Sequence, residues 1–477
     1  MSQPSSATKG AASGVPTAGD FRFVDPVLRA KYDVRGPRYT SYPPATHFAP
    51  LKPEQVQQCY SERNALDPDP GLSLYVHVPF CKARCLFCAC HTLTGGQAKG
   101  ADSYVAALIR DMKLAADWVN PARPVRQVAF GGGTPNFLTV EETDYLLDAL
   151  EAQWSVAEGA ELSAEIDPRQ STPEKLDAFL RHGFNRFSLG IQDFNHEVID
   201  RVRRGTDEMK VEEVVEHLRG RGCQEINFDF IYGLPGQSVD TARATARQAV
   251  AFGPTRIALY SYAHVPWLYK HQEALARAGL PEPDLKASIF LAMTDVFSEA
   301  GYISIGMDHF ALPQDRLAKA AVSRTLRRNF MGYTTGRGLD ILGFGASAIS
   351  SVGRCYAQNI KDIDSYRSSL LTGQRPLERG YLLDTDDLIR RELLLELFCN
   401  FHVDLRALET QFGIDAQTYF AQDLRKLDAL AQDGLVTWNR DAIDVTELGR
   451  LFVRNVCMTF DRHLENDPGR RMYSKTV

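Results

Sequence analysis

The stretch Cys81-Lys-Ala-Arg-Cys85-Leu-Phe-Cys88-Ala-Cys90 decides how the rest of this chain is interpreted. It directly follows Leu72-Ser-Leu-Tyr-Val-His-Val78, an apolar run that is typical of a buried strand. Cysteines at this spacing can turn three thiolates toward one point, and thiolates are ligands that zinc and iron–sulfur clusters select. Three thiolates leave one iron of a four-iron cluster without a protein ligand, so that iron can bind a small molecule.

Other interpretations of the cysteine loop stay open at this point. A structural zinc site usually uses two separate Cys or His pairs. A closed cluster with Cys90 as its fourth ligand would make the protein an electron carrier. The Cys-x3-Cys-x2-Cys spacing resembles that of the radical S-adenosylmethionine (SAM) superfamily, whose open iron is chelated by the methionine part of the cofactor. The other cysteines are isolated, at Cys59, Cys223, Cys355, Cys399 and Cys457.

Length and composition are those of an ordinary globular protein. The 477 residues are enough for a large core with an appendage, and 44% hydrophobic and 24% charged residues are typical of soluble chains. A net charge of −6 without a strong basic run argues against nucleic acid as the main partner. No apolar run approaches the ~18 residues that span a bilayer.

The N-terminal 70 residues differ from the rest in pattern. Met1 to Asp20 is rich in Ser, Ala, Gly and Pro, and we expect residues 1–20 to be a disordered tail without an export signal. The protein is therefore expected in the cytoplasm, where cysteines remain thiols or metal ligands. Residues 21–70 are expected to form an N-terminal arm. Its Gly36-Pro-Arg-Tyr-Thr-Ser-Tyr-Pro43 segment suits an ordered surface arm, or a lid over an active site.

From Gly71 onward, strand-length apolar runs alternate with helical patterns. This alternation predicts right-handed βαβ units and a parallel sheet. Six units are too few to close an eight-stranded barrel, so we expect an α/β fold with an open (β/α)6 partial barrel over residues 71–376. The expected strands are Leu72–Val78, Val125–Phe130, Glu161–Ile166, Arg186–Ile191, Glu225–Ile231 and Arg256–Tyr262. The expected helices are Asp102–Val119, Thr139–Trp154, Thr172–His182, Asp207–Arg221, Ser238–Phe252 and Leu285–Ala300.

In parallel α/β folds, ligands bind at the carboxyl ends of the strands. The first expected strand ends at the cysteine loop. The second ends at Gly131-Gly-Gly-Thr-Pro135, where a backbone without side chains can approach a ligand. Polar ends on all the expected strands predict one site at this edge. The later strands carry or precede Glu165 and Asp167, Gln192-Asp193 with Arg204, Asp229, and Tyr262-Ala-His-Val-Pro266.

The C-terminal part has a different pattern. Arg324, Arg327 and Arg328 form a basic cluster for which a solvated face is expected. Residues 377–477 are expected to form a mostly helical domain. Helices followed by a small β-wing resemble a winged-helix module, but the lack of a basic recognition face favours docking or substrate covering. The expected elements are helices Leu388–Asn400, Leu405–Phe412, Ala416–Gln432 and Glu447–His463 and strands Leu435–Trp438 and Ile443–Val445.

Together these motifs resemble the oxygen-independent coproporphyrinogen III oxidases (coproporphyrinogen III dehydrogenases), a radical SAM family of haem synthesis. The resemblance covers about Asp25 to the C-terminus, and the Cys-x-Cys ending differs from the Cys-x2-Cys of the haem-chaperone relatives. The motifs are Gly36–Pro43, Tyr75-Val-His-Val-Pro-Phe-Cys81, Cys88-Ala-Cys90, Gly131-Gly-Gly-Thr-Pro135, Gln192-Asp-Phe194, Ile231-Tyr-Gly-Leu-Pro235, Met307-Asp-His-Phe310 and Tyr356-Ala-Gln-Asn359. Departures from the family pattern include Ala89, His91-Thr92, Phe130, Ser261 and Arg203, which flanks a cofactor position.

The resemblance implies a set of site residues. Cys81, Cys85 and Cys88 would ligate one [4Fe–4S] cluster, and Cys90, close by without ligating, would be catalytic together with Tyr75. The family binds two molecules of SAM. Tyr75, Gly132, Glu165 and Ile349 match positions at the first, and Phe87, Gly133, Thr134, Gln192, Arg204, Asp229 and Ala263 match positions at the second.

The reaction implied by the resemblance is oxidative decarboxylation of the ring A and ring B propionates of coproporphyrinogen III to vinyl groups, giving protoporphyrinogen IX. An electron passed through the cluster would cleave SAM and give a 5′-deoxyadenosyl radical that takes a propionate hydrogen. A low-potential donor such as a flavodoxin or ferredoxin and a monomeric state are expected. Arginines such as Arg38 are candidates to anchor the four carboxylates of this tetrapyrrole substrate. The alternatives are a related radical SAM enzyme acting on haem or another substrate, or a non-catalytic haem-binding or haem-delivery protein.

Overall fold

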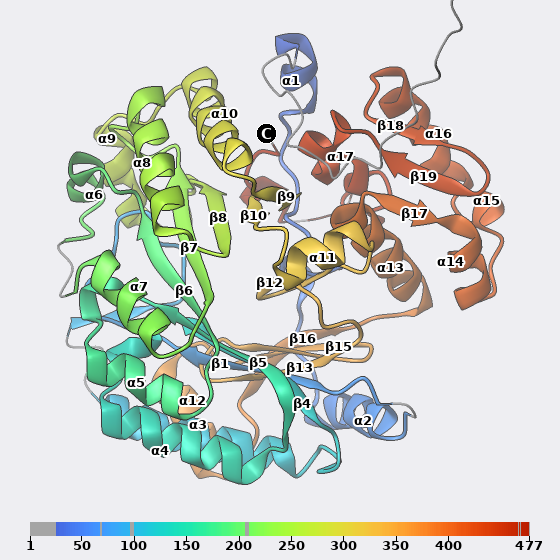
Figure 1. The fold of residues 1–477 in the computed structure, drawn as a ribbon. Helices are drawn as coiled ribbons and strands as arrows, with labels where there is room; N and C mark the ends of the chain where they lie inside the picture. The colour runs from blue at the N-terminus through green and yellow to red at the C-terminus, as the bar shows by residue number, and fades with distance from the viewer. Residues whose placement is uncertain are drawn as a thin grey trace, which may run out of the picture.

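The computed structural model describes residues 25–66, 69–95, 100–205, 209–465, 467 and 469–476, and the disordered tail expected over residues 1–20 lies outside them. A curved, twelve-stranded sheet forms the centre of the molecule (Figure 1). Its central strands lie in chain order and run parallel, which confirms the expected open (β/α)6 partial barrel. These strands are β1 Leu72–Val78, β4 Val125–Gly132, β5 Val156–Ile166, β6 Arg186–Gln192, β7 Glu225–Tyr232 and β8 Arg256–Ser261.

The helices that join these strands lie along the outer face of the sheet (Figure 1). Their starts are set by capping residues, because Thr139 before α4 and Ser238 before α8 each accept a hydrogen bond from a first-turn backbone amide. Gly253 ends α8 in a left-handed conformation, with φ of 62°. The helices are α3 Ala101–Ala116, α4 Val140–Gln153, α5 Pro173–Arg181, α6 His196–Arg201, α7 Val211–Gly220, α8 Val239–Phe252, α9 Glu273–Arg277 and α10 Pro283–Glu299.

Alternating burial along the strands defines the inside of the barrel. In β6, Phe187, Leu189 and Ile191 are buried, whereas the residues between them are only partly buried. Because successive side chains of a strand point to opposite faces, the buried set packs under the outer helices and the other set faces the barrel interior. The same pattern in β5 and β7 turns Glu165 and Asp229 toward that interior.

Further strands extend both edges of this sheet. Beyond β1 lie β13 Asp340–Phe344, β14 Ile349–Val352, β15 Cys355–Asn359 and β16 Leu377–Leu382, and beyond β8 lie β10 His309–Ala311 and β9 Ile303–Gly306. Strand β16 pairs with β15, so the segment expected to open the C-terminal domain at residue 377 belongs to the sheet. The division into tail, arm, catalytic region and C-terminal domain stays a prediction.

The N-terminal arm is not a surface segment. It contains α1 Pro26–Tyr32, a 3-10 turn at Ala45–His47 and α2 Pro53–Asn64, and it runs between α10 and the C-terminal helices (Figure 1). Tyr39 and Tyr42 are buried in a core that they share with the C-terminal region. The expectation of a surface position for Gly36–Pro43 is therefore wrong for these aromatic side chains, because the C-terminal region covers them.

The C-terminal region is mostly helical, as expected, with a small antiparallel sheet in the order β17-β19-β18. The continuous helix expected over Ala416–Gln432 is wrong, because Phe420 leaves the helical conformation (φ −99°, ψ 20°) and is buried against Phe460. The helix expected over Glu447–His463 is also wrong. The elements are α13 Thr385–Asn400, β17 His402–Asp404, α14 Leu405–Phe412, α15 Ala416–Tyr419, α16 Ala421–Gln432, β18 Val436–Trp438, β19 Ala442–Val445, a 3-10 turn at Gly449–Phe452 and α17 Val453–Met458.

The segment between β10 and β13 corrects one more expectation. It contains α11 Arg316–Val322, β11 Arg327–Asn329 and β12 Gly332–Thr334, and α12 Ile363–Leu371 follows β15. Arg327 is buried and paired with Glu392 and Glu396, so the solvated arginine face expected here is wrong for it. Arg328 is also partly buried, by aromatic rings.

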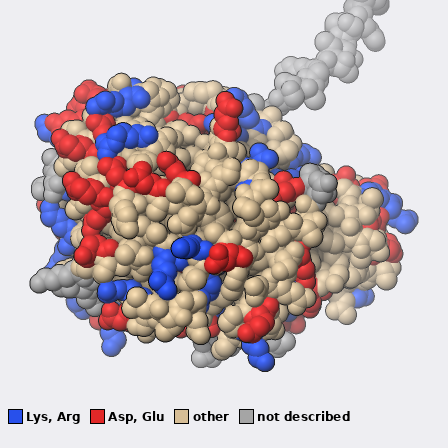
Figure 2. Space-filling view, turned by 90° about the horizontal axis from the view of Figure 1, so that it is seen from below, with Lys and Arg blue, Asp and Glu red and all other residues tan. Residues whose placement is uncertain are grey.

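The surface has mixed charge. Figure 2 shows basic and acidic side chains interspersed over the face seen from below, without a single basic field. Within the described residues, no helix is long and apolar enough to cross a membrane.

Candidate active site

The cysteine loop leaves the carboxyl end of β1 and is held by backbone contacts on several sides. Strand β2 Phe80–Cys81 pairs with β3 Leu93–Thr94, which closes the loop. The amide of Leu86 donates to the carbonyl of Val202 (3.0 Å). His271 Nε2 donates to the carbonyl of Cys88 (2.8 Å), and Gln272 Nε2 donates to that of Phe87 (3.1 Å). The loop is therefore fixed by its backbone, which leaves the thiols free to act as ligands.

All nine cysteines are free thiols, as expected. Cys81 Sγ lies 3.3 Å from the hydroxyl of Thr134. Burial raises the pKa of Cys81 to about 11, whereas the hydrogen bond from the Cys90 thiol lowers the pKa of Cys88 to about 6. The Cys90 amide also donates to Cys88 Sγ (3.4 Å). Cys90 therefore lies beside a loop thiol, as expected, and its role stays a prediction.

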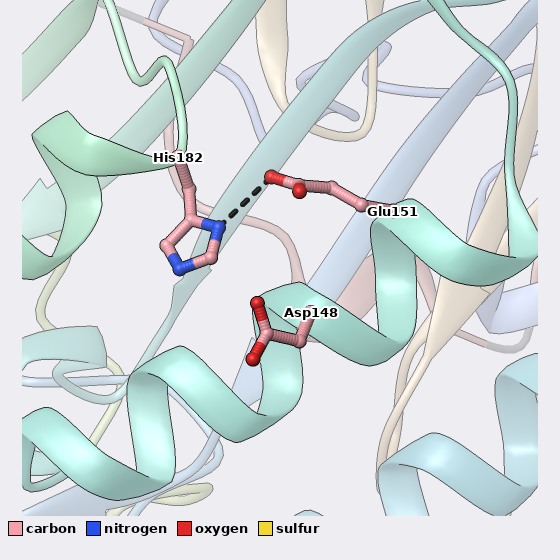
Figure 3. Close-up of side chains that lie close together, drawn as sticks. All are labelled: Asp148, Glu151 and His182. Atoms are coloured by element: carbon pink, nitrogen blue, oxygen red, sulfur yellow. Dashed lines mark hydrogen bonds and ion pairs between the residues drawn. The ribbon is translucent and has the colours of Figure 1, made fainter.

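The spacing of the thiols separates a cluster from a single ion. Thiolates around one zinc ion stand roughly 3.8 Å apart, given Zn–S bonds of about 2.3 Å. Among the described residues, three such donor atoms lie within 4.8 Å of one another only in Asp148, Glu151 and His182 (Figure 3). In the described residues, therefore, no three of the loop thiols are as close together as a single zinc ion requires.

The group in Figure 3 is not a convincing metal site. Asp148 and Glu151 are exposed on α4, and His182 follows α5, so all three lie on the outer layer of helices. His182 Nδ1 is 2.9 Å from Glu151 and its Nε2 is 3.3 Å from Asp144, so both ring nitrogens already have partners. These contacts are ordinary surface pairs between neighbouring helices.

The glycines at the end of β4 bring two strands close together. The Gly133 amide donates to the carbonyl of Val78 (2.7 Å), and a Cβ on Gly133 would lie only 2.6 Å from the carbonyl carbon of Pro79. A Cβ on Gly132 would lie 2.4 Å from the His77 ring, and this residue has φ of 110°. Only glycine permits this approach, which places the Gly131–Pro135 turn against the start of the cysteine loop.

Two carboxylates face the barrel interior near this turn. Glu165 Oε2 accepts a hydrogen bond from the Gly132 amide (3.2 Å). Burial within the barrel and repulsion by Asp229 raise the pKa of Glu165 to about 7, although water can still reach the side chain. Asp229 accepts hydrogen bonds from Ser188 (2.7 Å) and Asn227 (2.9 Å). Among the described residues, neither Glu165 nor Asp229 has a cationic partner in contact.

A buried ionic network lies behind the loop. Asp167 accepts from Arg169 (Nη2, 2.5 Å) and from Arg204 (Nη2, 3.2 Å). Both guanidinium groups also approach Cys85 Sγ, Arg169 at 3.6 Å and Arg204 at 3.8 Å. Hydrogen bonds to a ligand sulfur stabilise its negative charge and tune an iron–sulfur cluster. The resemblance implies Arg204 as a cofactor contact but not Arg169, whose signal in the sequence is its position two residues after Asp167.

The remaining expected residues lie around the same interior. Tyr75 on β1 donates to His77 Nδ1 (3.1 Å), because His77 Nε2 already donates to the carbonyl of His91 (3.2 Å). Gln192 ends β6 at a bulge, with φ of 72°. Ala263 follows β8, whereas Ile349 begins β14 on the far side of β1. The roles of these residues stay predictions, and His77, His271 and Gln272 were missed because single polar residues carry no pattern.

Comparisons with known proteins agree with this geometry. Residues 75–249 match the radical SAM superfamily and residues 383–452 match the HemN C-terminal domain. The oxygen-independent coproporphyrinogen III oxidase of Synechocystis sp. is 39% identical over 455 residues, which cover 94% of this chain and 97% of that protein. The enzyme of the same name from Escherichia coli is 39% identical over 453 residues, covering 95% and 98%.

A solved structure gives the same result. The coproporphyrinogen III oxidase (HemN) of Escherichia coli, described as a radical SAM enzyme, superimposes with a TM-score of 0.87 at 39% identity. The match covers 92% of this chain and 99% of that one. The agreement extends over the barrel, the arm and the C-terminal region together. This chain belongs to the oxygen-independent coproporphyrinogen III oxidase family.

Proposed function

We propose that this protein oxidatively decarboxylates the ring A and ring B propionates of coproporphyrinogen III to vinyl groups, giving protoporphyrinogen IX without oxygen. The observation that carries the proposal is the fixed three-thiol loop at the carboxyl end of β1, facing the interior that holds Glu165 and Asp229. Each conversion removes CO2, one hydrogen atom and one electron from a propionate. In this proposal residues 71–376 carry the chemistry, and the arm and the C-terminal domain cover the substrate.

Cys81, Cys85 and Cys88 would hold one [4Fe–4S] cluster. Their free thiols and the two guanidinium groups at Cys85 support this ligand set, because a cluster with its thiolate ligands is anionic. When bound, the cluster and SAM supply the radical that abstracts a hydrogen atom. Cys90 would stay off the iron and act near the reacting atoms.

The chain's own residues would bind and orient SAM. Glu165 and Asp229 can accept from cationic or hydroxyl groups, and the Gly132–Gly133 backbone leaves room for close approach. The hydroxyl of Tyr75 is oriented by His77. We assign Tyr75, Gly132, Glu165 and Ile349 to a first SAM. A second SAM is assigned to Phe87, Gly133, Thr134, Gln192, Arg204, Asp229 and Ala263.

The cellular context is part of the same proposal. The reaction needs a low-potential electron donor, such as a flavodoxin or ferredoxin, and an acceptor for the electron released with CO2. We propose a monomeric, cytoplasmic enzyme. The free thiols support a reducing compartment, since exposed thiols such as that of Cys90 do not persist under oxidising conditions.

The direct test is an anaerobic assay of the full chain with reconstituted cluster, SAM, a low-potential reductant and coproporphyrinogen III. We expect protoporphyrinogen IX, with SAM consumed in proportion to the CO2 released. A Cys85→Ala variant serves as the matched control, because it should lack the cluster while keeping the barrel. SAM cleavage without any change in the tetrapyrrole would contradict the proposed substrate.

A further inference from the structure

Cationic side chains from separate parts of the chain lie near Asp308 and the carboxyl ends of β7 and β8. We propose that Arg38, Lys286 and Arg328, here called the cationic cluster, bind the substrate carboxylates that are not decarboxylated. This inference rests on the proposed function and names the residues that recognise its substrate. Arg38 comes from the arm, Lys286 from α10 and Arg328 from β11.

Arg328 has donors without acceptors. Its guanidinium lies 4.8 Å from the ring of Tyr333 and 5.2 Å from that of Phe398. Its Nε and Nη1 atoms are buried and have no hydrogen-bond partner among the described residues. Its neighbour Arg327 instead pairs with Glu396 at 2.7 Å. Buried donors without acceptors are costly, so these atoms of Arg328 are explained by a ligand that supplies acceptors.

A series of ring contacts connects Arg328 to the barrel interior. The Tyr333 ring lies 5.2 Å from His309, and His309 lies 5.7 Å from Tyr260 on β8. Burial, Asp229, Asp308 and Glu165 raise the pKa of Tyr260, and Arg328 opposes them. Arg328 therefore acts on the same interior as the carboxylates assigned to SAM.

Lys286 and Arg38 border this interior from the other side. Lys286 Nζ donates to the carbonyl of Tyr262 (3.1 Å) and lies 5.7 Å from the ring of Tyr232, the last residue of β7. Burial and the nearby charge of Arg38 lower the pKa of Lys286 to about 8. The two cations are thus held close together despite their repulsion, which an anion between them would relieve.

The arm holds Arg38 in a fixed place. Buried Arg454 on α17 donates to the carbonyls of Gly36 and Pro37, the two residues before Arg38. The residue after it, Tyr39, donates to Asp461 (2.9 Å). The guanidinium of Arg38 itself has no ion pair within the described ranges of the chain. The backbone around Arg38 is therefore anchored, while its charged group stays available.

Carboxylates of the protein do not neutralise the cationic cluster. Asp308 is near Arg38 and Arg328 but lies 2.7 Å from His309 Nδ1. Burial alone would raise the pKa of Asp308, yet His309 and the two arginines lower it to about 2. Asp33, near Lys286, is paired with Lys475. An excess of positive charge remains, and guanidinium groups bind carboxylates through paired hydrogen bonds.

The charge of the cationic cluster selects which carboxylates it would hold. The cysteine loop leaves β1 and reaches the segment after β8, where His271 and Gln272 donate to it, so a ligand at the cationic cluster lies in the same interior as the cysteine loop. A propionate that reacts loses its carboxylate as CO2. The propionates that survive the reaction keep their negative charge, so they suit a permanently cationic site.

The test uses the cluster-loaded full chain and its variants Arg38→Gln, Lys286→Gln and Arg328→Gln. The probes are coproporphyrin III, which is stable and carries four carboxylates, and its tetramethyl ester, both titrated by fluorescence quenching. We expect each variant to bind coproporphyrin III about tenfold or more weakly, with ester binding and SAM binding unchanged. Arg38→Lys should recover part of the loss. Arg247→Gln, at an exposed arginine of α8, is the matched control and should bind like wild type.

Stability separates recognition from folding. Because the buried donors of Arg328 have no acceptors in the described residues, Arg328→Gln should keep the melting temperature while weakening binding. Equal affinities in all three folded variants would overturn the inference, and so would equal losses for the acid and the ester. If wild type binds coproporphyrin III through these residues but does not decarboxylate coproporphyrinogen III, the proposed function fails and the role of the cationic cluster stands. If the variants bind coproporphyrin III and turn over like wild type, the role of the cationic cluster fails and the proposed function stands.

Discussion

His77 offers a sharp test of how the site is built, because its protonation state follows from its contacts. The side chain is buried, with 6% of its surface exposed, between β1 and the glycine turn. Its Nε2 must carry hydrogen to donate to the carbonyl of His91, which leaves Nδ1 to accept from the hydroxyl of Tyr75. A proton on Nδ1 would remove this acceptor and turn the Tyr75 hydroxyl away.

The energetic consequence depends on pH. Burial lowers the pKa of His77 from 6.5 to about 4. The unfolded chain therefore binds a proton at a higher pH than the folded chain does. The contribution of neutral His77 to the free energy of unfolding is complete above about pH 6.5 and is lost as the pH falls toward 4. This contribution amounts to about 3 kcal/mol in total, of which about 2 kcal/mol is lost by about pH 5.

The measurement is the ¹⁵N spectrum of the histidine rings in the cluster-free chain, with His77→Gln to assign the signal. We expect the Nε2–H form of His77 with no protonation between pH 8 and pH 5. Chemical unfolding should also lose less stability over this range in His77→Gln than in wild type. A His77 signal that titrates near pH 6.5, or equal losses of stability in both proteins, would refute the reasoning.

Three further predictions concern the cofactor site. Cys85→Ala should abolish cluster assembly, whereas Cys90→Ala should retain iron; equal loss of iron in both would make Cys90 a ligand and remove the open iron. Glu165→Gln should keep the iron but bind SAM more weakly, because the neutral amide cannot pair with a cation; unchanged affinity in equilibrium dialysis would contradict this role. Arg204→Ala and Asp229→Ala should keep the fold and the iron yet lose ~30-fold or more in turnover. Near-normal turnover of a cluster-loaded variant would show that the assigned second SAM site does not operate.

The sequence predicts the barrel well because each element satisfies its own local rule. Strand β1 is buried on both faces, so its apolar run alone defines Leu72–Val78. Helices α4 and α8 begin where Thr139 and Ser238 can cap them. The site follows from the same rule, since the carboxyl ends of parallel strands meet at one edge.

Long-range packing explains what the sequence does not predict. The break at Phe420 exists because this ring packs against Phe460, which is distant in sequence. The left-handed conformation of Gln192 arises from a bulge against β7, for which no glycine gives a signal. Arg328 is indistinguishable from the exposed Arg324 in the sequence and becomes special only where Tyr333 and Phe398 enclose it.

The charges of the interior, taken with the two proposals, sort the substrates. Glu165 on β5 and Asp229 on β7 face the barrel interior and repel each other, which raises the pKa of Glu165. Arg38, Lys286 and Arg328 border the same interior with too few carboxylates to neutralise them. SAM carries a sulfonium and an amino group, whereas the porphyrinogen carries carboxylates, so each ligand relieves the repulsion within one of the two groups. Exchanging the two ligands would place like charges together at both groups. The same groups that destabilise the empty barrel would therefore fix which ligand each of them binds.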